Sequence, residues 1–244
     1  MKPYVAILLG LAVGLVLLGT CSSGGGGAGK SPTASPYAPT IDPAKFSDQV
    51  TNRYFPLTPG TTYVYEGTKD GAAQRDEFTV TRDTKTILGV RCVVVHHVVT
   101  EDGNLVEDTF DWHAQDNEGN VWYFGEDSKE YENGKVTSTK GSWEAGVDGA
   151  QPGIVMEAAP KVGDSYRQEY YRGEAEDMAR VLKTSESTTV SAGSYQGVVI
   201  TEDFTPLEPD VVEHKYFAPG VGFVKGSMVK GGSEEIELVK ITTD

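Results

Sequence analysis

Residues 111–127, DWHAQDNEGNVWYFGED, gather the side chains of this chain that are best suited to chemistry. The stretch contains one histidine, two tryptophans and five acidic residues around a Gly-Asn pair. Carboxylates and imidazoles transfer protons, carboxylate and amide oxygens hold Ca²⁺, and tryptophans offer large apolar contact surfaces with one hydrogen-bond donor. The elements that position these groups decide which of the three chemistries is available.

Asp116, Glu118 and Asn120 alternate along the turn as the oxygen ligands of a Ca²⁺ site would. An EF-hand loop needs Gly at its sixth position and a closing Glu at its twelfth, whereas Gly119 is the fourth residue counted from Asp116. The sequence also lacks the zinc signatures His-Glu-x-x-His and Cys-x-x-Cys. A looser Ca²⁺ site on the turn stays open as a hypothesis, and no other cofactor is predicted.

Paired carboxylates would fit a glycan hydrolase, in which two Asp or Glu residues flank the bond that breaks. Glu107, Asp111 and His113 share one face of an expected strand. The opposite face carries the apolar residues Val106, Phe110, Trp112 and Ala114. Such alternation is typical of a sheet with its apolar face inward and its polar face in water. We therefore expect the acids to face solvent, assign no catalytic residue and favour a non-enzymatic protein.

Two possible nucleophile arrangements also fail on spacing. Cys92 and His96 lie on one expected strand, which separates them by about 13 Å, and Cys92 sits among valines as a buried, inert thiol would. His96 and His97 point to opposite faces of that strand. The segment GSYQG, residues 193–197, has its serine one position early for a Gly-x-Ser-x-Gly elbow and is better interpreted as a turn.

The elements that carry these residues are predicted to be strands. Residues 90–99, VRCVVVHHVV, and the Tyr and Val positions at spacing two are strand material. Residues 101–104, 116–120 and 132–135 contain the Asp-Gly, Asn-Gly or Gly-Asn pairs of tight turns. Residues 174–182 form either a short helix or a loop that runs into a strand. The fold class predicted is all-β and antiparallel, with little helix.

An internal repeat divides the folded part. LTPGTTYVYEG (residues 57–67) resembles PKVGDSYRQEY (residues 160–170), and Val106-Glu107 matches Val212-Glu213. Three further matched pairs are Ala114 with Ala218, Gly119 with Gly222, and Val121 with Val224. We therefore predict one β-domain over residues 46–244, made of two tandem similar halves (about 54–140 and 160–244) that pack as a barrel-like domain or a sandwich.

The N-terminus predicts export and anchoring. Residues 1–20 have one early cation and an apolar run, as secretory signals do, and Leu18-Gly19-Thr20-Cys21 resembles the bacterial lipobox. That resemblance implies lipidation of Cys21, although Thr20 departs from the usual small residue at its position. A flexible Gly/Ser/Pro linker over residues 21–45 would follow. The alternatives are an uncleaved anchor and simple secretion, and each places the domain outside the cytoplasm.

The charge of the chain excludes one class of partner. Removal of residues 1–20 would take away only Lys2 and move the formal net charge from −15 to −16. Such a chain is a poor match for nucleic acid. Besides Cys21, Cys92 is the only cysteine, so no intrachain disulfide is predicted.

Four segments together resemble a group of uncharacterised secreted bacterial proteins, many of them lipoproteins. The segments are NRYFPLTPGTTYVYEG, DWHAQDNEGNVWYFGEDSKEYENGKV, GSWEAGVDGAQPGIVM and EHKYFAPGVGFVKG, and the resemblance covers nearly all of residues 50–244. The resemblance implies an extracytoplasmic β-domain. It supplies no catalytic residues.

The resulting expectation is a lipid-anchored protein on the extracytoplasmic face of the cell membrane that binds an apolar ligand, an envelope polymer or a partner protein. Four aromatic residues, Trp112, Trp122, Phe124 and Trp143, are the candidates to line a cleft between the halves, where pockets tend to form; the alternative is that they belong to the core. An Asp/Glu glycan hydrolase and a Ca²⁺-stabilised interaction module remain the alternatives.

Overall fold

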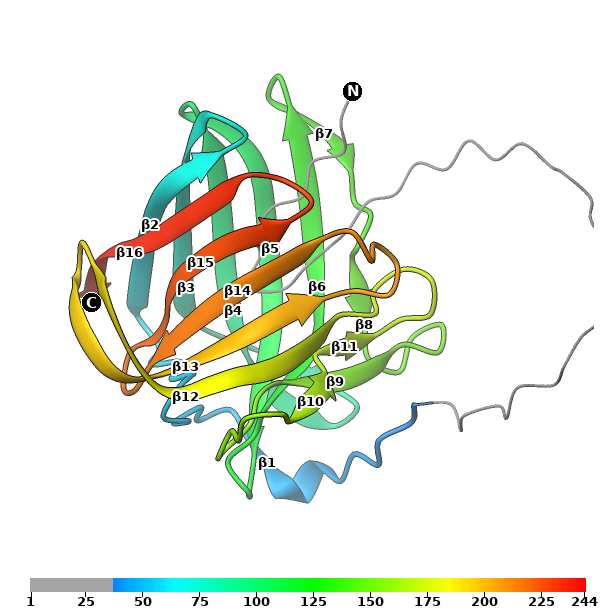
Figure 1. Ribbon diagram of the computed structural model, residues 1–244. Coiled ribbons are helices and arrows are strands. Elements are labelled where there is room, and N and C mark those ends of the chain that lie inside the picture. Colours follow the sequence, from blue (N-terminus) through cyan, green and yellow to red (C-terminus); the bar gives the residue numbers. More distant parts are fainter. Residues whose placement is uncertain (1–36) are drawn as a thin grey trace, which may run out of the picture.

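A computed structural model describes residues 37–244, and the predicted signal segment, Cys21 and most of the linker lie outside these residues. The described chain is all-β and antiparallel, as predicted, and a single 3₁₀ turn, η1 (Pro43–Lys45), accounts for its helix (Figure 1). The short strand β1 (Phe46–Ser47) follows η1 and pairs with β5.

Five long strands form a first meander, in which each strand pairs with the next. They are β2 (Thr61–Lys69), β3 (Ala72–Ile87), β4 (Val90–Glu101), β5 (Asn104–Asp116) and β6 (Val121–Glu132). Tight turns connect them because their central residues adopt positive φ. Asp70 and Gly71, between β2 and β3, have φ 47° and 91°, and Asp102 and Gly103, between β4 and β5, have φ 48° and 78°. The turn that follows β6 is similar, with φ 52° at Asn133 and 72° at Gly134. The turns predicted at residues 101–104, 116–120 and 132–135 are confirmed.

Short strands connect the two halves of the chain. They are β7 (Lys135–Ser138), β8 (Trp143–Glu144), β9 (Gln151–Met156), β10 (Ser165–Arg167) and β11 (Glu169–Tyr170). β7, β8 and β9 pair with β6, whereas β11 pairs with β9 and β10 with β12. A Cβ atom on Gly153 of β9 would lie 2.5 Å from the Arg167 carbonyl oxygen of β10. This close approach brings the two ends of the sheet together.

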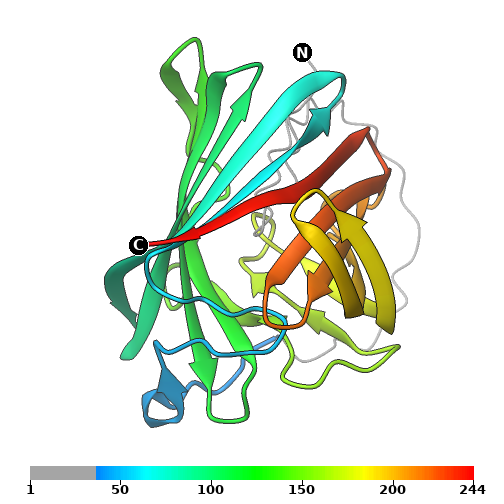
Figure 2. The ribbon, with the colours of Figure 1, turned by 90° about the vertical axis from the view of Figure 1, so that its left-hand side faces the viewer.

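Five strands form a second meander: β12 (Met178–Val190), β13 (Gly193–Phe204), β14 (Val212–Ala218), β15 (Gly222–Lys230) and β16 (Glu234–Thr243). β12 begins four residues into the segment 174–182, so the loop-into-strand interpretation is right and the helix is not formed. β16 pairs with β2 and joins the two meanders into one sheet. Figure 2 shows the meanders as two facing layers of a nearly closed barrel.

The two meanders run through the sheet in the same order, and matched residues of the repeat share their environment. Ala114 and Ala218 are buried, as are Val121 and Val224. The division of the domain into two repeats stays a prediction, since parallel burial is also expected of any two meanders that face each other.

The sheet buries apolar residues on both of its faces. The inner face of the barrel carries a cluster that includes Tyr65, Phe78 and Phe223. On the outer face, η1, β1 and the chain around β8 cover β4 to β6, where Phe46 contacts both Trp122 and Phe124 (ring centroids 5.9 and 5.6 Å). Strands covered on both faces cannot follow a simple apolar-in, polar-out rule.

Candidate binding site in the barrel interior

The polar face of β5 points inward, so the expectation that its acids face solvent is wrong. Glu107, Asp111 and His113 are 6%, 3% and 1% exposed. The physical reason is that the second meander covers the inner face of the first whatever its polarity. Alternation correctly identified which residues share a face, but it could not indicate which face the rest of the chain covers.

One part of the interior is apolar and filled. Tyr65 stacks near Phe223 (ring centroids 5.2 Å), and Phe78 lies beside Tyr63 (6.1 Å). A cavity of only about 10 Å³ remains among these residues. This volume holds at most about one water molecule, so this cavity has no space for an apolar ligand.

The first meander contributes a hydrogen-bonded group of acids to the other part. Tyr123 of β6 donates its hydroxyl to Asp111 of β5 (2.7 Å). Burial, together with the charges of Asp111 and Glu169, raises the pKa of the neighbouring Glu126 well above its usual range. Burial likewise raises the pKa of Glu107 to about 7, although the charge of His97 opposes the shift.

His97 is the cation partner on this side. Its Nε2 atom lies 3.7 Å from Asp76 Oδ2, and Gln74 donates to the other oxygen of that carboxylate (3.0 Å). Burial disfavours the imidazolium, but the charges of Asp76, Glu107 and Asp111 outweigh burial and raise the pKa of His97. A charged His97 is therefore favoured by its surroundings.

The segment between the meanders adds two buried carboxyl groups that influence each other's pKa. Trp143 donates its indole N–H to Glu169 Oε2 (2.7 Å). Burial raises the pKa of Asp177 to about 7, and burial together with the charge of Asp177 raises the pKa of Glu169 well above its usual range.

The second meander contributes a buried lysine between two acids. Lys215 Nζ of β14 lies 3.1 Å from Asp203 Oδ2 and 3.8 Å from Glu213 Oε2. Burial lowers the pKa of Lys215, but the two carboxylates more than compensate and raise it. Burial raises the pKa of Glu213 to about 8, although Lys215 opposes the shift.

Several acceptors in this interior have no protein hydrogen-bond partner. Neither carboxylate oxygen of Glu126 or of Glu213 accepts a hydrogen bond from the protein, and these residues are 1% and 0% exposed. Both ring nitrogens of His113, which lies between Phe55 and Tyr123, likewise have no protein hydrogen-bond partner. Burial lowers the pKa of His113 to about 3. Unmatched buried polar groups cost about 1–3 kcal/mol each, which makes this region a candidate for binding hydrogen-bond donors.

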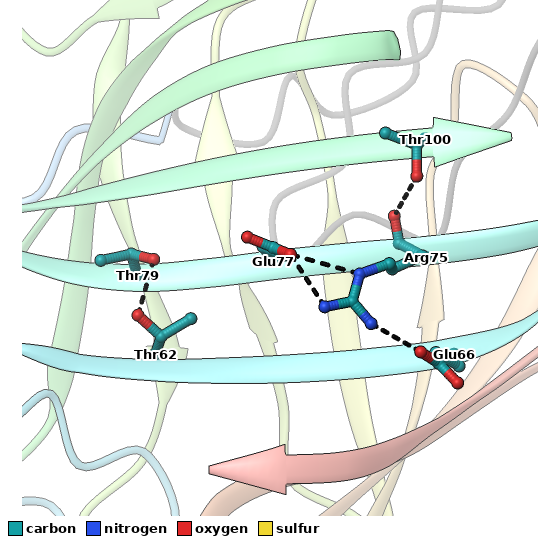
Figure 3. A network of polar contacts seen from close by, with 6 residues as sticks. All are labelled: Thr62, Glu66, Arg75, Glu77, Thr79 and Thr100. Atoms are coloured by element: carbon teal, nitrogen blue, oxygen red, sulfur yellow. Dashed lines mark hydrogen bonds and ion pairs between the residues drawn. The ribbon is translucent and has the colours of Figure 1, made fainter. Parts of the chain in front are cut away.

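The outer face of the same strands shows the opposite arrangement. Arg75 of β3 forms ion pairs with Glu66 of β2 and Glu77, and Thr62 exchanges a hydrogen bond with Thr79 (3.0 Å) (Figure 3). Here each drawn carboxylate has a cation beside it and water around it. These paired, exposed acids contrast with the buried acids of the interior.

The four predicted ligand-binding aromatics do not gather in one cleft. Trp122 and Phe124 lie on the outer face under Phe46. Trp112 is also on that face, beneath the ammonium group of Lys85 (3.3 Å from the ring centroid). Trp143 alone reaches the interior acids, through Glu169.

The predicted Ca²⁺ ligands organise the turn between β5 and β6. Asp116 Oδ1 accepts from the backbone N–H groups of Glu118 and Asn120 (3.0 and 2.9 Å). Its Oδ2 accepts from Asn120 Nδ2 and Trp122 Nε1 (2.9 and 2.8 Å). The donors already occupy both oxygens. In residues 37–244, no group of three or more His, Cys, Asp or Glu is arranged to hold a metal ion.

The thiol and the histidine pair behave as the sequence predicts. Cys92 is fully buried, and burial raises its pKa to about 12. His96 lies on the outer face, where it bonds Asp108 (3.0 Å), whereas His97 points inward. A dyad of Cys92 with His96 is therefore excluded by the chemistry of the thiol.

Sequence reasoning missed most of the interior acids. Glu126, Glu169, Asp177 and Asp203, like the cation Lys215, come from different segments, and no spacing rule connects them. One signal was available: Glu107 and Glu213 occupy matched positions of the repeat, and both face the interior.

Comparison with known proteins identifies no family for this chain. No family model matches it, and no curated protein matches it. Two similar solved structures are a candidate exported protein with a YmcC-like fold from Bacteroides fragilis and a candidate lipoprotein from Parabacteroides distasonis. The first is 15% identical with a TM-score of 0.45, covering 78% of this chain and 99% of that one. The second is 14% identical with a TM-score of 0.42, covering 78% and 98%.

Among the described residues, no helix has the length and apolar character needed to cross a membrane.

Proposed function

We propose that this protein is a lipid-anchored, extracytoplasmic binding protein that holds a ligand rich in cationic amino groups between its two meanders. The observation that carries the proposal is the set of buried, unmatched carboxylates contributed by both meanders, with Glu126 on one side and Glu213 on the other. Ammonium groups satisfy such acceptors with charge-assisted hydrogen bonds, which are stronger than neutral ones.

This proposal narrows the three ligand classes expected from the sequence. The apolar part of the interior has only about 10 Å³ of free space, which argues against an apolar ligand. The polar part contains many more acids than cations, which favours an amine-bearing polymer over a neutral one. A non-enzymatic role is retained from the sequence, which contains no nucleophile elbow and no zinc signature.

The ligand part is tested with two matched sugars. A glucosamine tetramer carries amino groups that are charged near neutral pH, and its N-acetylated counterpart has the same backbone without those charges. We expect calorimetric titration to show binding of the charged tetramer only, with affinity that falls as salt rises. Glu126→Gln and Glu213→Gln should each weaken binding about tenfold or more, the typical effect of losing one charge-assisted hydrogen bond.

Glu77→Gln is the control, because Glu77 is an acid on the outer face that Arg75 already pairs. Equal binding of the two tetramers, or no binding of either, would contradict the ligand proposal. Equal loss in Glu77→Gln would show that net charge, rather than the interior, causes the attraction.

The anchoring part rests on the lipobox resemblance of residues 18–21, which lie outside the described residues. Expression of the full chain in a bacterium with labelled palmitate should give a labelled protein in the membrane fraction. Cys21→Ser should lose the label and move to the soluble extracytoplasmic fraction. A labelled Cys21→Ser protein, or an unlabelled parent, would contradict lipidation at this residue.

A further inference from the structure

A groove of about 590 Å³ lies at the end of the barrel where a turn connects β3 to β4, and none of the interior acids lines it. Two segments form its walls: residues 48–59, before β2, and the ends of β3 and β4 that are next to their connecting turn. Its volume is in the range of about 300–1,000 Å³ typical of small-molecule sites. The lining residues that matter for recognition are Val50, Leu57, Arg82, Arg91 and Val93.

The groove contains two arginines in a chain whose formal net charge is −15. Arg91 uses its Nε atom for contacts with Asp48 Oδ2 (3.1 Å) and Thr84 Oγ1 (3.2 Å). Within residues 37–244, its two terminal amino groups make no hydrogen bond or ion pair. One side of the guanidinium is thus fixed, and the other remains available for a bidentate contact.

Arg82 is positioned by two unusual features of the backbone. The register of β3 against β4 shifts between Val80 and Thr84, which places Arg82 in a bulge. Its guanidinium lies over Gly60, where a Cβ atom would approach Arg82 Nη2 to 2.8 Å. Arg82 Nη2 also donates to the Asp244 carbonyl oxygen (2.9 Å). The glycine leaves the space that the guanidinium fills.

The floor of the groove is apolar, since Val50, Leu57 and Val93 are buried there. Two guanidinium groups above an apolar floor are complementary to a ligand with one anionic group and one apolar part. We propose that this groove binds a small phosphate-bearing ligand with an apolar body. Arg82 and Arg91 contact the phosphate, and the valines and leucine contact the body. The proposal does not depend on the function proposed for the interior.

Phenyl phosphate is the probe, with benzyl alcohol as its uncharged counterpart and inorganic phosphate as its counterpart without the ring. We expect calorimetry to show that phenyl phosphate binds more tightly than either. The Arg82→Gln, Arg91→Gln double variant should raise the Kd about tenfold or more, because it removes two charge-assisted contacts. Arg180→Gln is the matched control, since Arg180 pairs with Glu202 on the second meander and should leave the Kd unchanged.

A second variant shifts affinity in the opposite direction. Asp48→Asn removes the acid that competes for Arg91 and should lower the Kd about threefold, the expected sign for a surface charge pair. A variant that only perturbed the fold would not bind more tightly. The proposal is overturned if phenyl phosphate does not bind, or if the double variant binds as well as the parent.

A vesicle-binding experiment distinguishes a lipid headgroup from a soluble phosphate compound as the ligand. Sedimentation with phosphatidylglycerol vesicles, compared with phosphatidylcholine vesicles, reports binding to an anionic lipid headgroup. Loss of selective sedimentation in the double variant would identify the lipid as the phosphate source. Binding of phenyl phosphate without selective sedimentation would identify a soluble phosphate instead. All vesicle experiments use chains that carry Cys21→Ser, so that a lipid anchor cannot cause sedimentation.

Discussion

The barrel interior has an apolar part and a polar part, which are built from the same strands. The two parts differ in how well their buried side chains are packed and paired. In the apolar part, aromatic rings fill the space, and only about 10 Å³ is left empty. In the polar part, the buried acids outnumber the buried cations, and some of the acids have no hydrogen-bond partner. The apolar part therefore stabilises the fold, whereas the polar part reduces its stability and provides acceptors. Stability given up at one place is a frequent mark of a binding site.

The largest expected effect separates these two roles. Phe223→Ala removes a ring that packs on Tyr65 and Phe217 and should lower the free energy of unfolding by about 3–5 kcal/mol. Glu213→Gln should instead leave stability unchanged or raise it, because burial raises the pKa of Glu213 to about 8 and Lys215 keeps its closer partner Asp203 (3.1 Å, against 3.8 Å to Glu213). Denaturant unfolding of both variants measures the contrast. A strong loss of stability in Glu213→Gln would mean that the polar part also holds the fold together.

The next effect concerns the pH dependence of stability. Burial raises the pKa of Glu107 and Asp177 to about 7 and of Glu213 to about 8. The folded-state pKa values of these three acids exceed their unfolded-state values. Their contribution to the free energy of unfolding is therefore fully present below about pH 4. It is lost as the pH rises through 7 to 8. His113 acts in the opposite sense, since its lowered pKa of about 3 makes stability decline as the pH falls below about 6.5.

We therefore expect the melting temperature to peak in mildly acidic buffer and to fall toward pH 8.5. Thermal unfolding at a series of pH values measures this profile. Glu213→Gln should flatten the alkaline side, and His113→Leu should flatten the acidic side. A profile that rises continuously from pH 5 to 8.5 would contradict a polar interior of protonated carboxyl groups.

A smaller effect is expected at the turn between β5 and β6. Asp116→Ala removes four accepted hydrogen bonds that organise residues 116–122 and should cost about 1–2 kcal/mol. Millimolar Ca²⁺ should leave the melting temperature of the parent unchanged, because its donors already occupy the carboxylate. A rise in melting temperature that disappears in Asp116→Ala would instead support the Ca²⁺-stabilised module.

The sequence predicts the local parts of this structure well. Asp102-Gly103 and Asn133-Gly134 form tight turns that do not depend on the rest of the fold, because Asp, Asn and Gly readily adopt the positive φ angles seen there. The repeat pairs Ala114 with Ala218, and both are buried, although the division into two repeats stays a prediction. The sequence could not indicate which face of each strand the rest of the chain covers. Glu126 of β6 and Glu169 of β11 are brought near each other because the segment between the meanders folds back onto β6, and no periodicity encodes that approach.

The smallest effect is expected on the outer face and completes the comparison with the interior. Glu77→Gln breaks an ion pair with Arg75 in which both side chains are about half exposed. Water screens such a pair, so the loss should be at most about 1 kcal/mol and should shrink further in high salt. Denaturant unfolding in low and high salt measures it. Because Glu77 and Glu213 belong to one sheet and undergo the same substitution, a difference between them isolates burial as the cause. If both variants changed stability by the same amount and in the same direction, the distinction between a matched outer face and an unmatched interior would fail.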